Sequence, residues 1–279
     1  MTSTSLDYPD AMQNIDIYLS GKVLYGDDFD ASQVAQWHAD EREGYAGLGA
    51  NDRGGYKYAY HAWNAWHAFR HLPPNKRFRN ALGFGAAYGD EFRPIASRIA
   101  AITIVDPSAA FTQDSVCGIP ARYVAPAADG RLGLADGAFD LITAIGVLHH
   151  VPNVSFVVRE LARTLSRGGH LIIREPIVSM GDWRKPRPHL TRHERGIPLE
   201  ILKSIVRSSG LDLERVSLCG FRPVQRAFTV FRDDPNNSRV AVSIDAAACR
   251  LLSWNAHYHA RTFFQKLRPT SAFLVARKS

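Results

Sequence analysis

The stretch NALGFGAAYGDE, residues 80–91, decides the fold class of this chain. Its glycines follow an apolar run that we expect to form a strand, and its acidic end is expected to open a helix. Small residues let a backbone approach a ligand closely, and the first turn of a helix presents unpaired amide groups. The next apolar run, ITIVD at residues 102–106, ends in an acid 23 residues after Gly83. That spacing is typical of an acid that accepts hydrogen bonds from ribose hydroxyls, so we expect a ligand containing a nucleoside.

Short apolar runs alternate with helix-period segments on either side of this loop, from Lys76 to about Leu218. The alternation is typical of a parallel sheet whose strands are joined by crossover helices. One helix is expected over residues 153–167, with Asn153 as its N-cap, and a second over residues 198–209. Strands are expected at residues 78–83, 101–105, 122–125, 139–145, 170–174, 211–218 and, after a long interruption, 271–277.

Two segments lie outside this alternation. Residues 1–75 form an acidic, aromatic-rich N-terminal region whose strongest element is a helix expected over Tyr56–His71. Residues 221–268, approximately, form an insertion before the last strand, with an apolar helix expected through Ile244. The predicted organisation is therefore an N-terminal region followed by a main domain, 76–279, that contains the insertion. We expect both additions near the ligand edge of the sheet, as caps.

Nicotinamide dinucleotides and S-adenosylmethionine both contain a nucleoside, and three later runs separate them. DGAFDLI (136–142), VLHHVPN (147–153) and RELARTLSRGGHLIIREP (159–176) resemble class I S-adenosylmethionine-dependent methyltransferases, in the small-molecule branch close to methyltransferase type 11. Dinucleotide-binding dehydrogenases do not show this pattern. The resemblance covers about residues 77–218 and the last strand. It implies an α/β fold with a Rossmann-like seven-stranded sheet, mostly parallel with the last strand antiparallel, and helices on both faces. It also implies an enzyme whose cofactor is S-adenosylmethionine.

The resemblance implies roles for residues at the ends of the strands. The first loop would form the floor under the methionine and ribose parts of the cofactor, and Asp106 would hold the ribose diol. Pro107 would lie against the adenine, and its amino group would be contacted by Asp129 or the neighbouring Ala128. Backbone groups at the end of the fourth strand would face the amino acid end of the cofactor. The implied cofactor-binding residues are thus Gly83, Phe84, Gly85, Asp106, Pro107, Ala128, Asp129, Ile145 and Gly146.

The chain departs from this family at Ala81, where the family usually has an acid two residues before the first loop glycine. A contact to the ammonium group of the cofactor is therefore missing or supplied elsewhere. Asp90 and Glu91 are candidates, although acids in the first turn of a helix also serve the helix dipole alone. The departure suggests an alternative function, a catalytically weak or regulatory module that binds the cofactor.

Methyl transfer from a sulfonium ion is an in-line displacement, so positioning supplies most of the rate and only the proton of the acceptor needs a base. For a hydroxyl acceptor, a histidine is the natural base. His150 follows the fourth strand at the ligand edge and is the first candidate, with His149 behind it. A histidine in such a turn also commonly bonds backbone and shapes the loop, and that structural role remains the competing interpretation.

Contacts to the acceptor are expected from residues that follow the fifth strand and from the N-terminal region: Glu175, His189, His193 and Tyr60. Residues 191–198 also resemble stretches of bacterial methyltransferases found with surface-polysaccharide and sugar biosynthesis. The acceptor is therefore expected to be a small molecule or a glycan precursor, methylated on oxygen rather than on nitrogen or carbon. No metal site is expected, because the prolines at 186 and 188 oppose a helix that would align the two histidines of this segment.

The net charge of +7 over 279 residues is unevenly distributed. Residues 1–55 carry ten acidic and three basic side chains, so the remainder has a net charge of +14. The basic balance raises the alternative of a nucleic-acid methyltransferase, which we disfavour because the chain has no Asn/Asp-Pro-Pro-Tyr/Phe motif and no RNA-binding module. No nucleic-acid partner is therefore expected.

The chain also has no apolar run long enough to span a membrane and no secretory signal at its start. Its cysteines, at positions 117, 219 and 249, have no CxxC spacing, so neither a disulfide framework nor a zinc site of cysteines is expected. A cytoplasmic location is expected from this composition.

Overall fold

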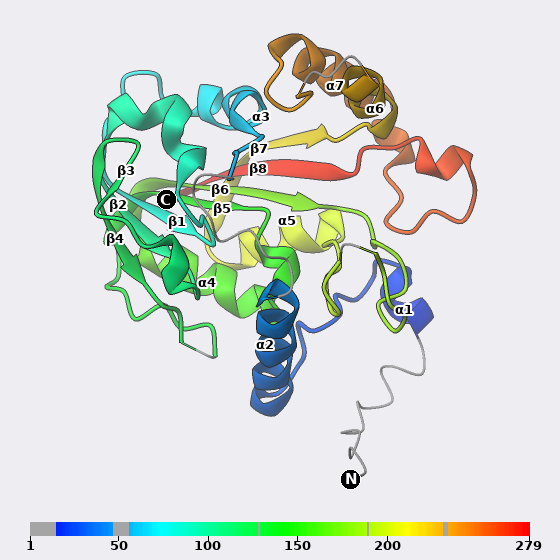
Figure 1. Ribbon diagram of the computed structural model, residues 1–279, viewed down its shortest axis with the longest axis horizontal. Coiled ribbons are helices and arrows are strands. Elements are labelled where there is room, and N and C mark those ends of the chain that lie inside the picture. The colour runs from blue at the N-terminus through cyan, green and yellow to red at the C-terminus, as the bar shows by residue number, and fades with distance from the viewer. Residues whose placement is uncertain (1–14, 47–55, 128, 189, 231–233) are drawn as a thin grey trace.

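A mixed sheet forms the centre of the molecule, with helices on both of its faces (Figure 1). The computed structural model describes residues 15–46, 56–127, 129–188, 190–230 and 234–279. The strands are β1 (Phe78–Phe84), β2 (Ile99–Val105), β3 (Ser115–Val116), β4 (Ile119–Val124), β5 (Phe139–Ile145), β6 (Leu165–Pro176), β7 (Leu211–Cys219) and β8 (Ser271–Lys278). Their order is β3-β4-β2-β1-β5-β6-β8-β7, with β4, β2, β1, β5 and β6 parallel and β8 antiparallel between β6 and β7.

This sheet confirms the predicted α/β fold and the antiparallel last strand, with two differences. The eighth strand, β3, has only two residues and was not predicted; it pairs with the start of β4. The strand β6 begins at Leu165, five residues before the predicted start, because Leu165 already pairs with Phe139 of β5. Helix α4 (Val154–Thr164) consequently ends three residues earlier than predicted. Asn153 precedes α4 but makes no side-chain cap, because its Nδ2 donates to the backbone oxygen of Asp129 at 3.1 Å.

The other helices range from a single turn to the 16 residues of α2, and several are of the 3-10 type. The α-helices are α1 (Ile15–Leu19), α2 (Ala31–Ala46), α3 (His61–His67), α5 (Leu199–Ser208), α6 (Arg222–Val230) and α7 (Arg239–Leu251); the 3-10 helices used below are η2 (Phe69–His71), η3 (Asp90–Arg98) and η5 (Leu148–His150). The bounds of α5 agree with the prediction for residues 198–209. The helix expected at Asp90 forms as the 3-10 helix η3, which contains Pro94. Helix α6 was not predicted.

The helix predicted over Tyr56–His71 is wrong in extent. Helix α3 begins only at His61, whose N–H donates to Asn237 Oδ1 at 2.7 Å, and the N–H of Trp63 donates to the carbonyl of Asn236 at 3.0 Å. Because the insertion supplies acceptors for these first amide groups, the helix can start there without a preceding turn. These hydrogen bonds also join the N-terminal region to the insertion.

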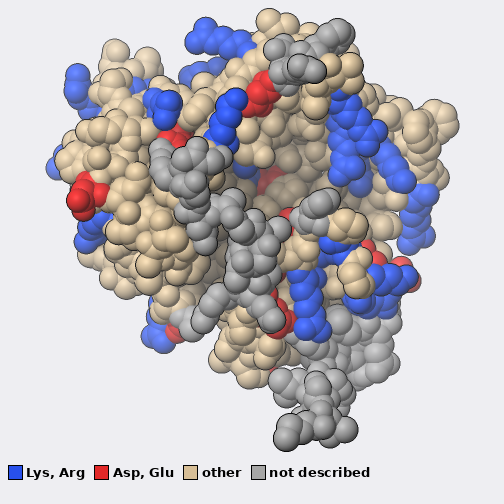
Figure 2. All heavy atoms as spheres, viewed as in Figure 1, with Lys and Arg blue, Asp and Glu red and all other residues tan. Residues whose placement is uncertain are grey.

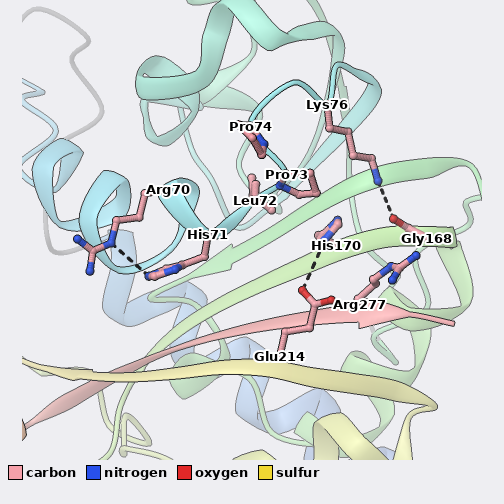
Figure 3. A pocket seen from close by; sticks show the side chains of 10 residues that line it. All are labelled: Arg70, His71, Leu72, Pro73, Pro74, Lys76, Gly168, His170, Glu214 and Arg277. Atoms are coloured by element: carbon pink, nitrogen blue, oxygen red, sulfur yellow. Dashed lines mark hydrogen bonds and ion pairs between the residues drawn. The ribbon is translucent and has the colours of Figure 1, made fainter.

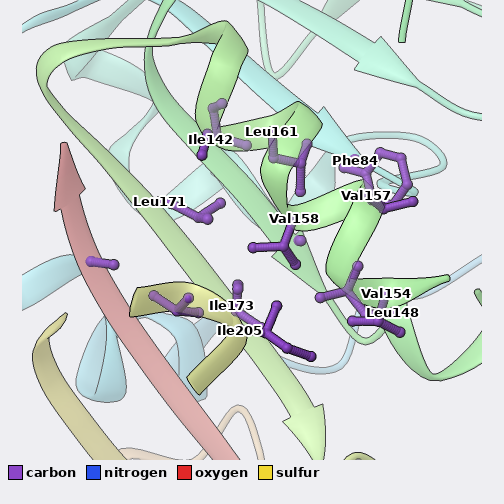
Figure 4. Packing of buried hydrophobic residues seen from close by; sticks show 14 of the residues in the cluster. Phe84, Ile142, Leu148, Val154, Val157, Val158, Leu161, Leu171, Ile173 and Ile205 are labelled. Atoms are coloured by element: carbon purple, nitrogen blue, oxygen red, sulfur yellow. The ribbon is translucent and has the colours of Figure 1, made fainter. Parts of the chain in front are cut away.

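Two hydrophobic clusters hold the helices on the sheet. On one face, α4 directs Val154, Val157 and Leu161 toward Ile142 and Ile173 of the sheet, and all five are buried (Figure 4). On the other face, Trp63 of α3 and Val242 of α7 pack in a second cluster with strand residues such as Phe273. Each fully buried side chain of this kind contributes about 1.5–3 kcal/mol by leaving water. The sheet is therefore fixed from both sides, and its strand ends are held in place.

Two helices of the N-terminal region, α2 and α3, lie on opposite sides of the sheet (Figure 1). Around α2 an aromatic cluster forms, in which Tyr25 stacks on Trp183 with ring centroids 4.7 Å apart and also contacts Trp37. Trp37 Nε1 donates to the carbonyl of His150 at 2.8 Å, which ties α2 to the turn after β5. Among the described residues, no helix is long and apolar enough to cross a membrane.

Candidate functional site

The loop after β1 is shaped by Gly85. Its φ is +62°, a conformation that favours glycine, and its N–H donates to the carbonyl of Val105 at 2.8 Å. A Cβ atom on Gly85 would lie 2.2 Å from Cγ2 of Val147, the residue that precedes η5. The loop predicted from Gly83, Phe84 and Gly85 therefore lies directly against the end of β5. The contact of this backbone with a ligand stays a prediction.

Asp106 follows β2 at the same edge and is half-buried. Its Oδ2 accepts a hydrogen bond from the N–H of Ala87 at 3.1 Å, and its Oδ1 accepts one from the N–H of Ser108 at 2.9 Å. Burial raises the pKa of Asp106, and these two hydrogen bonds oppose the rise. Each carboxylate oxygen has a second lone pair, so the side chain is oriented and can still accept hydrogen bonds from a diol. Pro107 is exposed beside it.

Of the two residues predicted to contact the adenine, the structure describes only Asp129. Ala128 is outside the described residues. Asp129 is held by Arg131, whose backbone N–H donates to Oδ1 at 3.0 Å and whose Nε donates to Oδ2 at 2.6 Å. The carboxylate of Asp129 is therefore already engaged by a neighbouring cation.

The end of β5 brings Ile145 and Gly146 against Arg174 of β6. The φ of Gly146 is +70°, and a Cβ atom on it would lie 2.6 Å from Nη2 of Arg174. The guanidinium group of Arg174 lies 4.2 Å from the ring centre of Tyr60, which stacks on Trp63. Tyr60 is thus placed at the end of β5. Nη1 of Arg174 is buried and has no hydrogen-bond partner among the described residues.

A buried carboxyl group lies beside β1 although Ala81 supplies none. Glu91 is 3% exposed, and its Oε1 contacts the hydroxyl group of Thr143 on β5. The same hydroxyl group lies 3.3 Å from the backbone oxygen of Leu82, immediately before the glycine loop. Burial raises the pKa of Glu91 to about 7, although Thr143 and the positive charge of Arg174 lower it. Of the two candidates that the sequence offered, Glu91 is the one at this position.

The turn η5 after β5 is organised by Glu175 at the end of β6. This carboxylate is 0% exposed and accepts hydrogen bonds from the N–H groups of Val147 and Leu148 at 3.0 and 2.7 Å. It also lies 2.6 Å from Nδ1 of His149. Burial would raise the pKa of Glu175, but His149 and the amide donors hold it below its ordinary value. The expected contact between Glu175 and an acceptor is therefore revised, because Glu175 acts on the turn and on His149.

His149 has a carboxylate at one ring nitrogen, which suits it to act as a base better than the sequence suggested. Because the carboxylate of Glu175 faces Nδ1, we assign the proton to Nδ1, and Nε2 then carries the lone pair. Nε2 lies 3.7 Å from Oε1 of Glu194. Burial and the neighbouring His150 lower the pKa of His149, so its ring is neutral, although Glu175 opposes this shift.

His150 is half-buried beside α2. Its Nδ1 lies 3.1 Å from Oε2 of Glu41, a residue that is 5% exposed. Burial would raise the pKa of Glu41, but His150 and the hydroxyl group of Thr191 lower it, and no described residue donates a well-formed hydrogen bond to Oε1. Glu41 could not be predicted from the sequence, because 109 residues separate it from His150.

Arg195, which is fully buried, locks these segments together. Its Nε donates to the carbonyl of Tyr25 at 3.0 Å, and its Nη1 and Nη2 donate to the carbonyls of His149 and Val151 at 3.0 and 2.9 Å. The guanidinium group thus joins the N-terminal region, the turn η5 and the segment before α5. No local sequence pattern predicts this role, because the acceptors are distant carbonyl groups.

Of the two histidines expected to contact an acceptor in this segment, the structure describes only His193. His189 is outside the described residues. His193 is 2% exposed; its ring stacks on Trp37 at 4.6 Å and its Nε2 lies 2.7 Å from Oδ2 of Asp40. His193 therefore anchors α2, which corrects the expectation.

A cavity of about 720 Å³ lies at the opposite edge of the sheet, where the parallel strands begin (Figure 3). None of the predicted site residues lines it, and we do not assign it to the candidate site. Its lining residues are Arg70, His71, Leu72, Pro73, Pro74, Lys76, Gly168, His170, Glu214 and Arg277. Figure 2 shows a separate hollow near the centre of the visible face, with acidic side chains on its floor and Lys and Arg side chains on its rim.

Comparisons with known proteins agree with this geometry. Residues 82–173 match a family model described as a methyltransferase domain, and they include the glycine loop, Asp106 and the turn η5. None of the curated proteins matches the chain in sequence.

Several solved structures share the fold at low identity. The complex of the Haloferax volcanii Trm112 methyltransferase activator with its methyltransferase is 17% identical, covers 88% of this chain and 96% of that chain, and has a TM-score of 0.52. Phosphoethanolamine N-methyltransferase 2 of Haemonchus contortus, bound to phosphomonomethylethanolamine and S-adenosylhomocysteine, is 16% identical, covers 77% and 52% of the two chains, and has a TM-score of 0.50. An S-adenosylmethionine-dependent methyltransferase of Listeria monocytogenes is 12% identical, covers 78% and 99%, and has a TM-score of 0.50.

These neighbours show the fold, and the region that matches the family model contains the ends of β1, β2 and β5. The chain therefore has the fold of S-adenosylmethionine-dependent methyltransferases and contains a region, residues 82–173, that matches a methyltransferase domain.

Proposed function

We propose that this methyltransferase transfers the methyl group of S-adenosylmethionine to an oxygen atom of a small molecule or a glycan precursor. The observation that carries the proposal is the pair of His149 and His150 at the end of β5, each with a carboxylate on its Nδ1. A histidine whose second nitrogen is held by a carboxylate is a competent base for a hydroxyl group.

The residues at the strand ends fit the cofactor. The loop of Gly83, Phe84 and Gly85 would lie under its methionine and ribose parts, and Asp106 would accept hydrogen bonds from the ribose diol. Adenine would lie near Pro107, with Asp129 at the rim, and the methionine end would lie against Ile145 and Gly146.

Two further side chains support this placement. Nη1 of Arg174 is buried without a partner among the described residues, and the carboxylate of the methionine part would provide one. Glu91 lies beside the glycine loop and would hold the ammonium group in place of the acid absent at Ala81. This substitution weakens the case for the alternative function, a cofactor-binding module without efficient turnover.

The cofactor supplies an activated methyl group on a sulfonium ion, and the residues of the chain position the acceptor and move its proton. With Nδ1 of His150 on Glu41, Nε2 would accept the proton of the acceptor hydroxyl group as its oxygen becomes the nucleophile. A water-excluding site would favour this transfer over hydrolysis.

The two additions to the core would supply that enclosure. We propose that the N-terminal region, residues 1–75, and the insertion, about 221–268, wall the acceptor pocket. Helix α2 carries Glu41 to His150, and α3 is tied to the insertion through Asn236 and Asn237. Tyr60 lies before α3, where it would contact the acceptor or the cofactor.

The proposal is tested by supplying S-adenosylmethionine with a labelled methyl group and a panel of hydroxylated small molecules, including sugar nucleotides, each with a matched amine. We expect a methyl ether product, and we expect His150→Gln to lower kcat by about 10²–10⁴-fold with little change in the KM of the cofactor. A control variant, His71→Gln at the opposite edge, should retain full activity. Transfer to amines alone, or a fully active His150→Gln variant, would contradict the proposal.

A further inference from the structure

Two histidines and one carboxylate converge at the end of β5. One ring nitrogen of His149, one of His150 and one oxygen of Glu194 all lie within 4.8 Å of one another. Two ligands placed about 2.1 Å from a tetrahedral zinc ion stand about 3.4 Å apart. Nε2 of His149 and Oε1 of Glu194 are separated by 3.7 Å, so this pair already has nearly the spacing of metal ligands.

We propose that His149, His150 and Glu194 bind a divalent transition-metal ion, with zinc as the representative ion. Two imidazole nitrogens and one carboxylate oxygen suit zinc and its neighbours in the first transition row, whereas magnesium and calcium prefer oxygen ligands alone. Three protein ligands also leave a position for a further oxygen atom, as in catalytic zinc sites.

The groups behind these ligands have the arrangement that metal sites require. Histidine ligands usually donate their second ring nitrogen to a carboxylate, which fixes the tautomer and orients the ring. Glu175 occupies this position on His149 at 2.6 Å, and Glu41 occupies it on His150 at 3.1 Å. Both histidines are therefore held by carboxylates that come from other elements, β6 and α2.

An unpartnered buried oxygen gives independent support. Glu41 is 5% exposed, and no described residue donates a well-formed hydrogen bond to its Oε1, although the hydroxyl group of Thr191 lies close enough to help lower the pKa of the carboxyl group. A buried carboxylate oxygen without a donor is costly unless positive charge lies nearby. A dication beside His150 would supply that charge.

The negative charge around His149, His150 and Glu194 also favours a bound cation. Three buried carboxylates, those of Glu41, Glu175 and Glu194, are in excess over two guanidinium groups, those of Arg187 and Arg195. Both guanidinium groups direct their hydrogen bonds to backbone carbonyls. The excess negative charge would attract a cation to the ligands.

The turn that carries the histidines is also rigid. Glu175 accepts hydrogen bonds from its amide groups, and Arg195 donates to its carbonyls. A site held from both sides loses little conformational entropy when an ion binds. Metal binding does not depend on the proposed function, but its effect on catalysis does. A dication here would lower the pKa of an acceptor hydroxyl group. His149 and His150 would then bind the ion instead of accepting the proton of that hydroxyl group.

The test uses the full chain after removal of metals with a chelator, titrated with zinc chloride in a calorimeter. We expect one equivalent of zinc to bind with a Kd of about 1 μM or tighter, and magnesium chloride to give no comparable binding. Glu194→Gln should weaken zinc binding by at least about 10-fold, and Glu41→Gln by about 10–100-fold. Glu194→Gln keeps a carbonyl oxygen for the hydrogen bond that Thr191 N–H now donates at 3.1 Å, so the fold should be preserved. The control His71→Gln should bind zinc as the unmodified protein does.

The outcomes separate this inference from the proposed function. Absence of zinc binding to the stripped protein, or equal zinc affinity of Glu194→Gln and the unmodified protein, would overturn the metal site. Binding of S-adenosylhomocysteine is measured on the same stripped sample and reports the cofactor site alone. If zinc binds as expected and no hydroxyl acceptor is methylated, the metal site stands and the proposed oxygen acceptor fails.

Discussion

Glu91 is a buried acid whose environment differs strongly from that of an ordinary surface acid. It lies beside the glycine loop, 3% exposed, with Thr143 as its hydrogen-bonding partner. Under the proposed function, Glu91 would hold the ammonium group of the cofactor in place of the acid absent at Ala81. Because burial raises its pKa, its protonation also contributes to the pH dependence of stability.

Replacement of Glu91 by Gln should change the pH dependence of stability. Burial raises the pKa of Glu91 from 4.5 to about 7, so between these pH values the folded state binds a proton that the unfolded state has released. The raised pKa therefore costs stability as pH rises through this window, by up to about 3 kcal/mol at neutral pH. Relative to the unmodified protein, Glu91→Gln should gain free energy of unfolding between pH 4.5 and 7.5, measured by urea denaturation. The exposed control Glu200→Gln should show no such gain, and a constant difference across pH for Glu91→Gln would contradict the assignment.

The position of a residue in the sheet could be predicted where one short segment holds the information. The spacing between Gly83 and Asp106 lies within a single strand-loop-strand unit, and both residues are at the predicted edge. The partners of His150 and His149 could not be predicted, because Glu41 and Glu194 arrive from a helix and a loop that are distant in sequence. Contacts of this kind depend on the packing of whole elements.

At the scale of elements, the parallel strands were predictable because continuous apolar runs bury both faces of a sheet. The ends of α3 and α4 could not be predicted, because contacts with distant segments determine where α3 begins and where α4 ends. Helix α3 begins where Asn237 supplies an acceptor, and α4 ends where β6 already pairs with β5. The hydrophobic periodicity of each helical segment indicates neither the start of α3 nor the end of α4.

Arg195 joins three elements, and its loss should loosen all of them. Arg195→Met keeps much of the side-chain volume but removes the donors to the carbonyls of Tyr25, Leu148, His149 and Val151. Each buried carbonyl left without a donor costs about 1–3 kcal/mol, so we expect a loss of at least about 3 kcal/mol in the free energy of unfolding. Chemical denaturation measures this loss. Arg184→Met removes a surface ion pair with Asp182 and should leave the free energy of unfolding nearly unchanged. An equally small effect of Arg195→Met would show that the hydrogen bonds of Arg195 contribute little to stability.

At the scale of the whole molecule, the acidic N-terminal region and the basic remainder of the chain are joined by ion pairs. Within the described residues, the ion pairs between residues 15–46 and the rest of the chain involve Asp40 and Glu41 of α2, with Arg192, His193 and His150 as partners. The acidic N-terminal region therefore meets the basic core at the candidate site.

The central claim is that the ends of the parallel strands form a cofactor site for methyl transfer. Its most direct test is calorimetric titration of the full chain with S-adenosylhomocysteine, for the unmodified protein and for Asp106→Asn. The variant keeps an oxygen for one of the two backbone hydrogen bonds but loses the carboxylate that would hold the ribose. We predict one bound equivalent for the unmodified protein and an affinity about 10–100-fold weaker for Asp106→Asn, as expected for losing charged hydrogen bonds. Failure of the folded, unmodified protein to bind S-adenosylhomocysteine, or equal affinity of the two proteins, would contradict the account.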